Sequence, residues 1–230
     1  LAMGKLFAPF TGVAADNPFS SYGTRRSPEQ LATVTSDNRF ICFPYPKLMN
    51  ARDAVNQGAA VVMTSVGKAK ELGIDPAKWV FLHGCSEANE KLLVSDRVDY
   101  HSSPAIRANT QQAFEMAGKT VEDIDLIDIY SCFPSAVEVA CKELGLSHVD
   151  PRGLTVTGGL PFFGGPGNNY SMHAIATLLP LLRAQPGQFA LLTANGGRLS
   201  KHATGIYSAT PVRGAWQRES NTKLQAQIDD

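Results

Sequence analysis

The sequence predicts an α/β fold, a mixed and mainly parallel sheet covered by helices on both faces. Short apolar stretches rich in branched residues alternate with longer stretches whose apolar residues recur at helical spacing. The 20 glycines and 14 prolines separate these stretches, and 43% of the residues are apolar. A chain of 230 residues with this composition is long enough to bury a substantial core, in one large domain or two smaller ones.

Charge and cysteine content exclude several classes of function. Lys plus Arg and Asp plus Glu number 21 each, so the charge balance favours neither nucleic acid nor an anionic membrane as a partner. No apolar run approaches the roughly 18 residues of a membrane-spanning helix. The four cysteines lie in no metal-ligand spacing, which predicts no metal site and a reducing, cytoplasmic compartment. Because the chain opens on Leu1, with Met3 inside, we expect a fragment of a longer protein.

Residue period and capping residues predict the elements in chain order. Residues 7–38 have no sustained period and predict a long loop, except for a short helix that Ser27 caps and Pro28 opens. Arg25 and Arg26 precede this helix and are candidates for contacting a phosphorylated ligand, although a solvated surface pair is the commoner arrangement. The predicted strands are 58–64, 79–83, 125–130, 154–157, 189–193 and 202–208. The predicted helices are 47–57, 66–72, 104–117, 134–144 and 171–183.

One junction between a strand and a helix stands out. The buried strand 125–130 is followed by Pro134, which opens a helix that ends at Gly145, so Cys132 lies just before a helix N-terminus. The unpaired N–H groups and the dipole of such a terminus can lower a thiol pKa or hold an anion. The alternative is that Cys132 is a small buried apolar residue, as free cysteines usually are.

Two further bends also follow predicted strands. The glycine-rich run 158–170 exposes N–H groups suited to a phosphate or a carbonyl oxygen, but its spacing matches neither the Walker nor the dinucleotide fingerprint. The run Asn195-Gly196-Gly197 predicts the turn of a hairpin. Because sites in such sheets gather at the carboxyl ends of strands, we expect Cys132 and the bends 164–170 and 195–197 to converge.

Several of these stretches resemble the thiolases. The resemblance is carried by Pro104-Ala105-Ile106-Arg107, by the run 121–128 and, upstream, by Asn50-Ala51 and the run 56–60. It extends over residues 47–207 and is closest to the sterol-carrier-type thiolases and the thiolase-like proteins of bacteria. Thiolases have two βαβαβαββ halves, with a loop subdomain inserted in the first half.

The resemblance implies a division of this chain into four parts. Residues 1–46 correspond to a segment of the loop region, and 47–103 to the end of the N-terminal half. Residues 104–212 correspond to the C-terminal half, and 213–230 form a polar tail or linker. The segment that bears the acylated cysteine of the first half is absent from this chain.

The thiolase motifs fall on residues that differ from the usual ones. Tyr130-Ser131-Cys132-Phe133 falls on Asn-Glu-Ala-Phe, or on His-Asp-Cys-Phe in the sterol-carrier branch, with Tyr130 in place of the Asn or His. Gly164-Gly165-Pro166 falls on Gly-His-Pro, so Gly165 replaces the catalytic histidine. The Cys-x-Gly motif falls on Ala194-Asn195-Gly196, which has no cysteine. Claisen condensation needs a base and an oxyanion hole, so ordinary thiolysis or condensation by this chain is not expected.

The function implied by the resemblance is that of an acyl-CoA acyltransferase of the acetyl-CoA acetyltransferase family. Its expected catalytic residues are Cys132 as the thiol, His173 or His202 as the base, and Tyr130 and Asn195. A lone histidine on a helix, as His173 is, is more often a packed or surface residue. The residues expected to bind coenzyme A, the thioester carrier, are Gly164, Gly165, Asn168 and Asn169. The resemblance also implies a homodimer.

Two alternatives from other classes of function remain open. One is a module that binds acyl-CoA or lipid and has lost the chemistry. The other is a structural subunit of a larger acyl-CoA complex.

Overall fold

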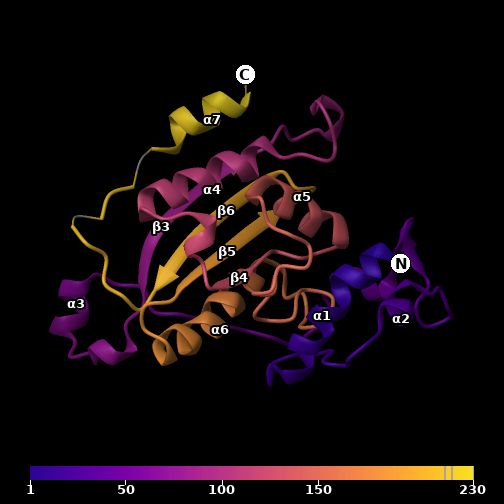
Figure 1. Ribbon diagram of the computed structural model, residues 1–230, viewed down its shortest axis with the longest axis horizontal. Coiled ribbons are helices and arrows are strands. Elements are labelled where there is room, and N and C mark those ends of the chain that lie inside the picture. Colours follow the sequence, from indigo (N-terminus) through magenta and orange to yellow (C-terminus); the bar gives the residue numbers. More distant parts are fainter. Residues whose placement is uncertain (215, 219, 230) are drawn as a thin grey trace.

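A four-stranded mixed sheet forms the centre of the computed structural model, which describes residues 1–214, 216–218 and 220–229 (Figure 1). Its strands are β3 (Phe81–Asn89), β4 (Leu126–Asp128), β5 (Phe189–Gly196) and β6 (Lys201–Ser208), in the order β3-β6-β5-β4. β4 pairs with β5 in parallel, and β6 is antiparallel to both of its neighbours. It follows that β3, β4 and β5 run in one direction, and their carboxyl ends meet at one edge beside the start of β6.

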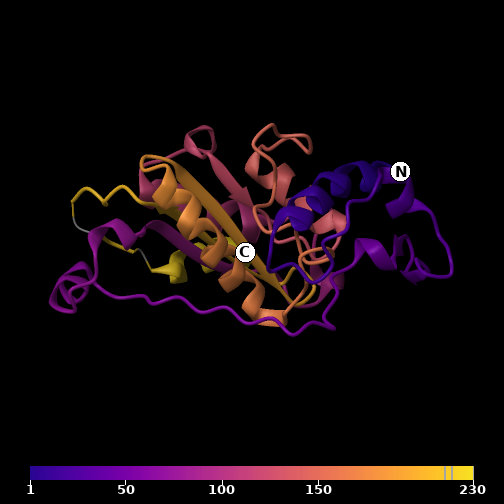
Figure 2. The ribbon, with the colours of Figure 1, turned by 90° about the horizontal axis from the view of Figure 1, so that it is seen from below.

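Helices cover both faces of this sheet, as the sequence predicts (Figure 1, Figure 2). α4 (Pro104–Ala117) and α5 (Pro134–Leu144) pack on one face, where Leu191 of β5 belongs to the larger apolar cluster. α6 (Tyr170–Ala184) packs on the other face, against Ala190 and Leu192. Successive residues of β5 therefore alternate between the two layers, as the pleat of a strand requires. The mixed α/β fold with helices on both faces is confirmed, but the sheet is not mainly parallel, because, among the described residues, two of its three strand pairings are antiparallel.

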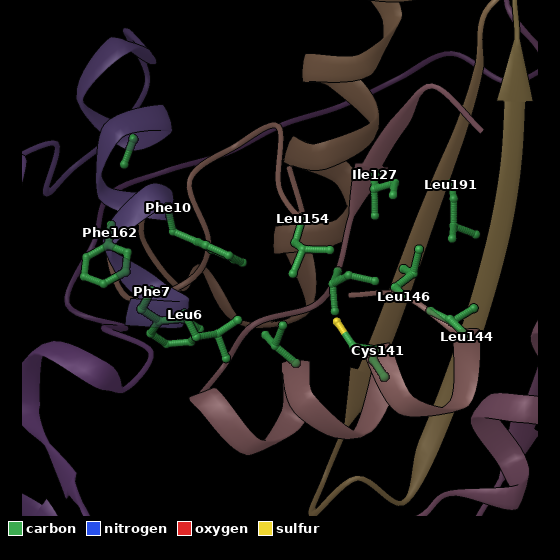
Figure 3. Packing of buried hydrophobic residues seen from close by; sticks show 14 of the residues in the cluster. Leu6, Phe7, Phe10, Ile127, Cys141, Leu144, Leu146, Leu154, Phe162 and Leu191 are labelled. Atoms are coloured by element: carbon green, nitrogen blue, oxygen red, sulfur yellow. The ribbon is translucent and has the colours of Figure 1, made fainter. Parts of the chain in front are cut away.

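The N-terminal segment is helical where the sequence analysis predicts a loop. α1 (Ala2–Asp16) buries Phe7 and Phe10 in the same cluster as Leu154 and Phe162 (Figure 3). The rings of Phe7 and Phe162 meet edge to face, with their centroids 5.8 Å apart. The loop prediction is therefore wrong for this segment. Pro9 lies inside α1, and although a proline usually interrupts a helix, tertiary packing outweighs that local preference here.

The capping residues predicted from the sequence are found at the ends of four other helices. Ser27 and Gln30 form a capping box, Ser65 and Ser103 cap their helices, and Gly118 and Gly145 end theirs in the left-handed conformation. The remaining elements are α2 (Pro28–Ala32), α3 (Val66–Glu71), α7 (Asn221–Asp229) and the two-stranded sheet of β1 (Phe40–Cys42) and β2 (Tyr45–Pro46). Single 3-10 turns occur at Lys47–Met49, Pro76–Lys78, Val94–Asp96, Val121–Asp123 and Gly167–Asn169.

Three predicted elements are wrong. Residues 58–64 pair with no strand of the described chain, and Val62 and Met63 are 87% and 79% exposed. Residues 154–157 run beside the end of β4, where the Ile129 N–H donates to Leu154 O at 2.9 Å, but form no strand. Of the predicted helix 47–57, only its first turn is helical. A branched apolar run makes a strand only where a partner supplies hydrogen bonds, and the run itself does not reveal one.

The segment that follows the 3-10 turn Lys47–Met49 is extended and crosses the molecule below α6 (Figure 2). The Ala51 N–H donates to Cys132 O at 2.7 Å, and the Gly165 N–H donates to Arg52 O at 2.8 Å. The division at residues 46, 103 and 212 stays a prediction. Among the described residues, no helix is both long enough and apolar enough to cross a membrane.

The contact between α1 and the glycine-rich run generates a stability prediction. A Cβ at Gly158, whose φ is +108°, would lie 2.5 Å from Cα and 2.6 Å from N of Ala14, whereas a Cβ at Gly153, at φ +77°, meets open space. Gly153→Ala is expected to cost about 1 kcal/mol, for backbone strain alone. Gly158→Ala adds overpacking and is expected to cost about 2–4 kcal/mol in total, measured by urea unfolding. Equal costs for the two variants would contradict a tight contact at Gly158.

Candidate functional site

A buried carboxyl group lies at the end of β4. Asp128 Oδ2 accepts hydrogen bonds from Thr155 Oγ1 at 3.0 Å, Val156 N at 2.9 Å and Thr157 N at 3.2 Å. Its Oδ1 accepts one from the Tyr170 hydroxyl at 3.3 Å. Burial raises the pKa of Asp128, and the hydrogen bonds from Val156, Thr155 and Thr157 oppose that rise. This carboxyl joins three separate segments, and sequence reasoning missed it because an acidic residue in a strand gives no sign of its partners.

Tyr170 connects this carboxyl to the predicted site. It is the first residue of α6 and is fully buried, and its ring lies edge-on to that of Tyr130, with centroids 5.3 Å apart. The Tyr130 N–H donates to Thr193 Oγ1 of β5 at 3.0 Å. Burial raises the pKa of Tyr130 to about 12, so its phenol stays protonated at neutral pH and can donate a hydrogen bond. The aromatic pair thus holds Tyr130 against the start of α6.

Cys132 and Asn195 come together at the carboxyl ends of β4 and β5, as the sequence predicts. The predicted turn 195–197 is wrong in its start, because β5 continues through Asn195 to Gly196 in its ladder with β6. The Cys132 thiol donates to Asn195 Oδ1 at 3.9 Å. Burial raises the pKa of Cys132 to about 11, against the smaller lowering effect of Asn195. The neighbouring N-terminus of α5 therefore does not make Cys132 a thiolate at neutral pH. The raised pKa fits the alternative that Cys132 is an apolar packing residue, although its side chain is only partly buried, and its role stays a prediction.

A cavity of about 840 Å³ opens beside these residues at the sheet edge. Its walls come from β3, β5, β6, the start of α6, Tyr130 and α7. The lining residues are Glu87, Asn89, Tyr130, Asn168, Ser171, Ala194, Asn195, Gly196, Lys201, His202, Ala203, Asn221, Thr222, Gln225, Ala226 and Asp229. The cavity combines small apolar residues with hydroxyl and amide groups and with the charged side chains of Glu87, Lys201 and Asp229. A mixture of apolar and polar groups is typical of a site for an organic ligand.

The two histidines considered as bases differ in position. His202 lies opposite Asn195 in the β5–β6 ladder and lines the cavity, with Nε2 3.2 Å from Leu199 O. His173 lies outside the cavity lining, and its ring packs edge-on to Phe163 at 5.2 Å. Burial lowers the pKa of both imidazoles, so both are neutral at pH 7.

The glycine-rich loop contacts the chain rather than the cavity at most of its predicted binding residues. Gly164 packs against the Gln57 side chain, and the Gly165 N–H is occupied by Arg52 O. Asn169 exchanges two hydrogen bonds with the backbone of Ala59, at 2.8 and 3.1 Å. Of the four residues, Asn168 lines the cavity.

The structure thus brings Tyr130, Asn195, Asn168 and His202 to one cavity and places Cys132 outside its lining, in contact with Asn195. The roles assigned to these residues, to His173 and to the glycines stay predictions. Sequence reasoning missed Ser171 and the α7 residues. Ser171 had a detectable signal, since it directly follows the glycine-rich loop, but α7 had none, because it meets β3 across more than a hundred residues. In the described part of the chain, no group of three or more His, Cys, Asp or Glu residues is placed to hold a metal ion.

Comparisons with known proteins bear on the family and the fold of this chain. Residues 86–166 match the family model described as thiolase C-terminal domain-like. The crystal structure of a monomeric SCP2-thiolase like protein type 1 from Mycobacterium smegmatis superposes with a TM-score of 0.92 and 52% sequence identity, over 99% of this chain and 50% of that one. The chain belongs to the thiolase superfamily.

Curated members of the thiolase superfamily are more distant in sequence. A 3-ketoacyl-CoA thiolase of Aeromonas salmonicida is 27% identical over 181 residues, 76% of this chain and 44% of the relative. Acetyl-CoA acetyltransferase IA of Candida tropicalis is 27% identical over 190 residues, 82% of this chain and 43% of the relative. The chain therefore spans less than half the length of these relatives.

Two substitutions of Asp128 are expected to distinguish the effect of its charge on the unfolding free energy from the effect of its hydrogen bonds. Asp128→Ala leaves buried N–H donors of Val156 and Thr157 unpaired and is expected to cost about 3 kcal/mol or more. Asp128→Asn keeps one acceptor oxygen and is expected to cost about 1 kcal/mol.

The pH dependence gives a second readout of the same variants. Because the folded pKa of Asp128 is raised, the folded state binds more protons, and its contribution to the unfolding free energy falls as pH rises from about 4 through the folded pKa. Asp128→Asn is expected to remove that fall in urea titrations across this range. An unchanged pH profile in Asp128→Asn would contradict a raised pKa.

The thiol generates a second prediction. With a pKa of about 11, only about one Cys132 in 3,000 is a thiolate at about pH 7.5, so iodoacetamide is expected to alkylate it slowly. Its rate is expected to rise about tenfold per pH unit up to about pH 10. Exposed Cys42 serves as the internal control in peptide mass spectrometry. Labelling of Cys132 as fast as Cys42 near neutral pH would show an activated thiol instead.

Proposed function

We propose that this chain is part of a thiolase-like protein that binds acyl-CoA thioesters in the cavity beside Tyr130 and Asn195. The observation that carries the proposal is the convergence of Tyr130, Asn195, Asn168 and Ser171 on one cavity of about 840 Å³. Clefts at the carboxyl ends of strands are where ligands bind in sheets of this kind. The relatives named above are enzymes of CoA thioesters, which makes that ligand class the natural one to test.

The thioester carbonyl is the group that this site suits. Tyr130 carries a neutral phenol that can donate a hydrogen bond to the carbonyl oxygen. The Asn195 oxygen is oriented toward the Cys132 thiol, so its NH₂ group is the half of the amide available to a ligand. Two neutral donors of this kind polarise a carbonyl, in the manner of an oxyanion hole. Asn168 and Ser171, at the start of α6, are suited to the amide groups of the pantetheine arm.

Binding without turnover by these residues is favoured over acyl transfer at Cys132. The raised pKa of the Cys132 thiol keeps it protonated at neutral pH, and the thiol lies outside the cavity lining, in contact with Asn195. Nucleophilic catalysis needs an activated thiolate or an adjacent base. Acyltransferase activity of a longer protein is the second candidate, favoured by the likeness to acetyl-CoA acetyltransferase IA. It requires a nucleophile from outside this chain.

Assembly and location are proposals as well. A homodimer and a cytoplasmic location follow from the thiolase resemblance and the unpaired cysteines. The similar solved protein from Mycobacterium smegmatis is monomeric.

Calorimetry with acetyl-CoA tests the proposed function. We expect saturable binding, and Tyr130→Phe and Asn195→Ala are each expected to weaken it about tenfold by removing one hydrogen-bond donor. Asn56→Ala, at an exposed asparagine outside the cavity lining, is the matched control and is expected to bind as the unchanged protein does. Absence of saturable binding would sink the proposal. Release of free CoA that depends on Cys132 would favour acyl transfer instead.

A further inference from the structure

A second cavity, of about 700 Å³, lies beside the N-terminal helices. It is bounded by α2, by the loop that follows α2 and by the segment that begins at the 3-10 turn Lys47–Met49. Figure 1 shows α2 beside α1, at the end of the molecule that holds the N-terminus. This cavity shares no lining residue with the cavity beside Tyr130. Three basic and two acidic side chains line it: Arg26, Lys47, Arg52, Glu29 and Asp37.

The structure holds the guanidinium group of Arg52 in one orientation. Arg52 Nε donates to Pro161 O at 2.7 Å, and the guanidinium carbon lies 3.6 Å from the centroid of the Tyr22 ring. The Tyr22 hydroxyl in turn donates to Ala54 O at 2.7 Å. The two terminal NH₂ groups of Arg52 have no acceptor among the described residues, and both reach solvent. Arg52 is therefore oriented in advance, with four N–H donors left for a ligand.

Arg26 lies near Arg52, and neither has a counter-ion. The Arg26 N–H donates to Thr11 Oγ1 at 3.0 Å, which fixes the residue against α1. Burial lowers the pKa of Arg52 to about 10, and the positive charge of Arg26 adds to that lowering. In the described part of the chain, no carboxylate forms an ion pair with Arg26, Lys47 or Arg52. Two half-buried like charges repel each other, and a bound anion would remove that cost.

We propose that this cavity binds a phosphate group, held jointly by the guanidinium groups of Arg26 and Arg52. A guanidinium presents paired N–H donors that match two phosphate oxygens, and a phosphate has oxygens enough for both arginines. Glu29 and Asp37 also line the cavity, so an anion is held only where both arginines reach it. The site goes beyond the proposed function, because its residues are separate from those beside Tyr130. A phosphorylated metabolite and the nucleotide end of CoA both carry such a group.

Phosphorus NMR of inorganic phosphate, titrated at constant ionic strength, tests the site. We expect saturable binding with a dissociation constant of about 1 mM or below. Arg26→Met and Arg52→Met are each expected to weaken it about tenfold, because each removes charge-assisted hydrogen bonds. Arg52→Lys keeps the charge but loses the paired donors, so it is expected to bind more weakly than the unchanged protein.

Arg25 provides a matched control beside Arg26. It is exposed, lies outside the cavity lining and pairs with Asp16 at 2.6 Å. Arg25→Met removes the same charge from the same region and is expected to change phosphate binding by less than about twofold. Circular dichroism verifies that each variant keeps the fold. Acetate, titrated in the same way, shows whether a carboxylate serves equally well.

Competition with CoA identifies the source of the phosphate group. Displacement of inorganic phosphate by CoA assigns the group to that carrier, and dephospho-CoA, which lacks the ribose phosphate, shows which phosphate of CoA is held. Binding that CoA does not displace assigns a separate phosphorylated molecule. Either outcome supports a phosphate site.

Three results would overturn the proposal. They are the absence of saturable phosphate binding by the unchanged protein, acetate binding as tight as that of phosphate, and a loss in Arg25→Met as large as the loss in Arg52→Met. The probe is inorganic phosphate alone, so a failure of acyl-CoA binding leaves this test unaffected. A failure of this test likewise leaves the proposed function standing.

Discussion

The site depends on one buried carboxyl group. Asp128 is fully buried, and removing a carboxyl group from water is costly unless its oxygens are hydrogen-bonded. Those hydrogen bonds come from Thr155 and Thr157 in one loop and from Tyr170 at the start of α6. The hydrogen bonds to the Asp128 carboxyl group therefore hold the loop 155–157 and the start of α6 in place beside β4. Tyr130, two residues beyond Asp128 and packed on Tyr170, takes its place from this arrangement.

Burial also determines the chemical character of the site. It raises the pKa of Tyr130 and Cys132 and lowers the pKa of His173 and His202, so each of these groups favours its neutral form. A set of neutral donors and acceptors is suited to holding a polar ligand by hydrogen bonds. The same set is poorly suited to supplying a nucleophile, because thiolates need nearby positive charge or access to water. The raised pKa of the Cys132 thiol and its place outside the cavity lining thus both favour ligand binding without acyl transfer at this thiol.

The glycine-rich loop has a sequence pattern typical of a ligand site, but most of its predicted binding residues contact other parts of the chain. Its glycines and Asn169 hold an extended segment of the chain through Arg52, Gln57 and Ala59. Close backbone approach, the property that suggests a ligand site in the sequence, is here used for contact within the chain. Asn168 is the neighbour that reaches the cavity. A run of glycines predicts that another group comes close to the backbone, but it does not show whether that group is a ligand or another segment of the chain.

Features that depend on neighbouring residues in the chain could be predicted from the sequence. Helix ends at Ser27, Ser103, Gly118 and Gly145 are correct because a cap satisfies backbone groups within one turn. The meeting of Cys132 and Asn195 was also predictable, since the carboxyl ends of strands that run in one direction share an edge. Tertiary contacts were needed to see that residues 58–64 have no strand partner among the described residues, that α1 is a helix despite Pro9, and that α7 lines the cavity. These outcomes rest on hydrogen bonds and apolar contacts between residues far apart along the chain, and a local pattern carries no record of those partners.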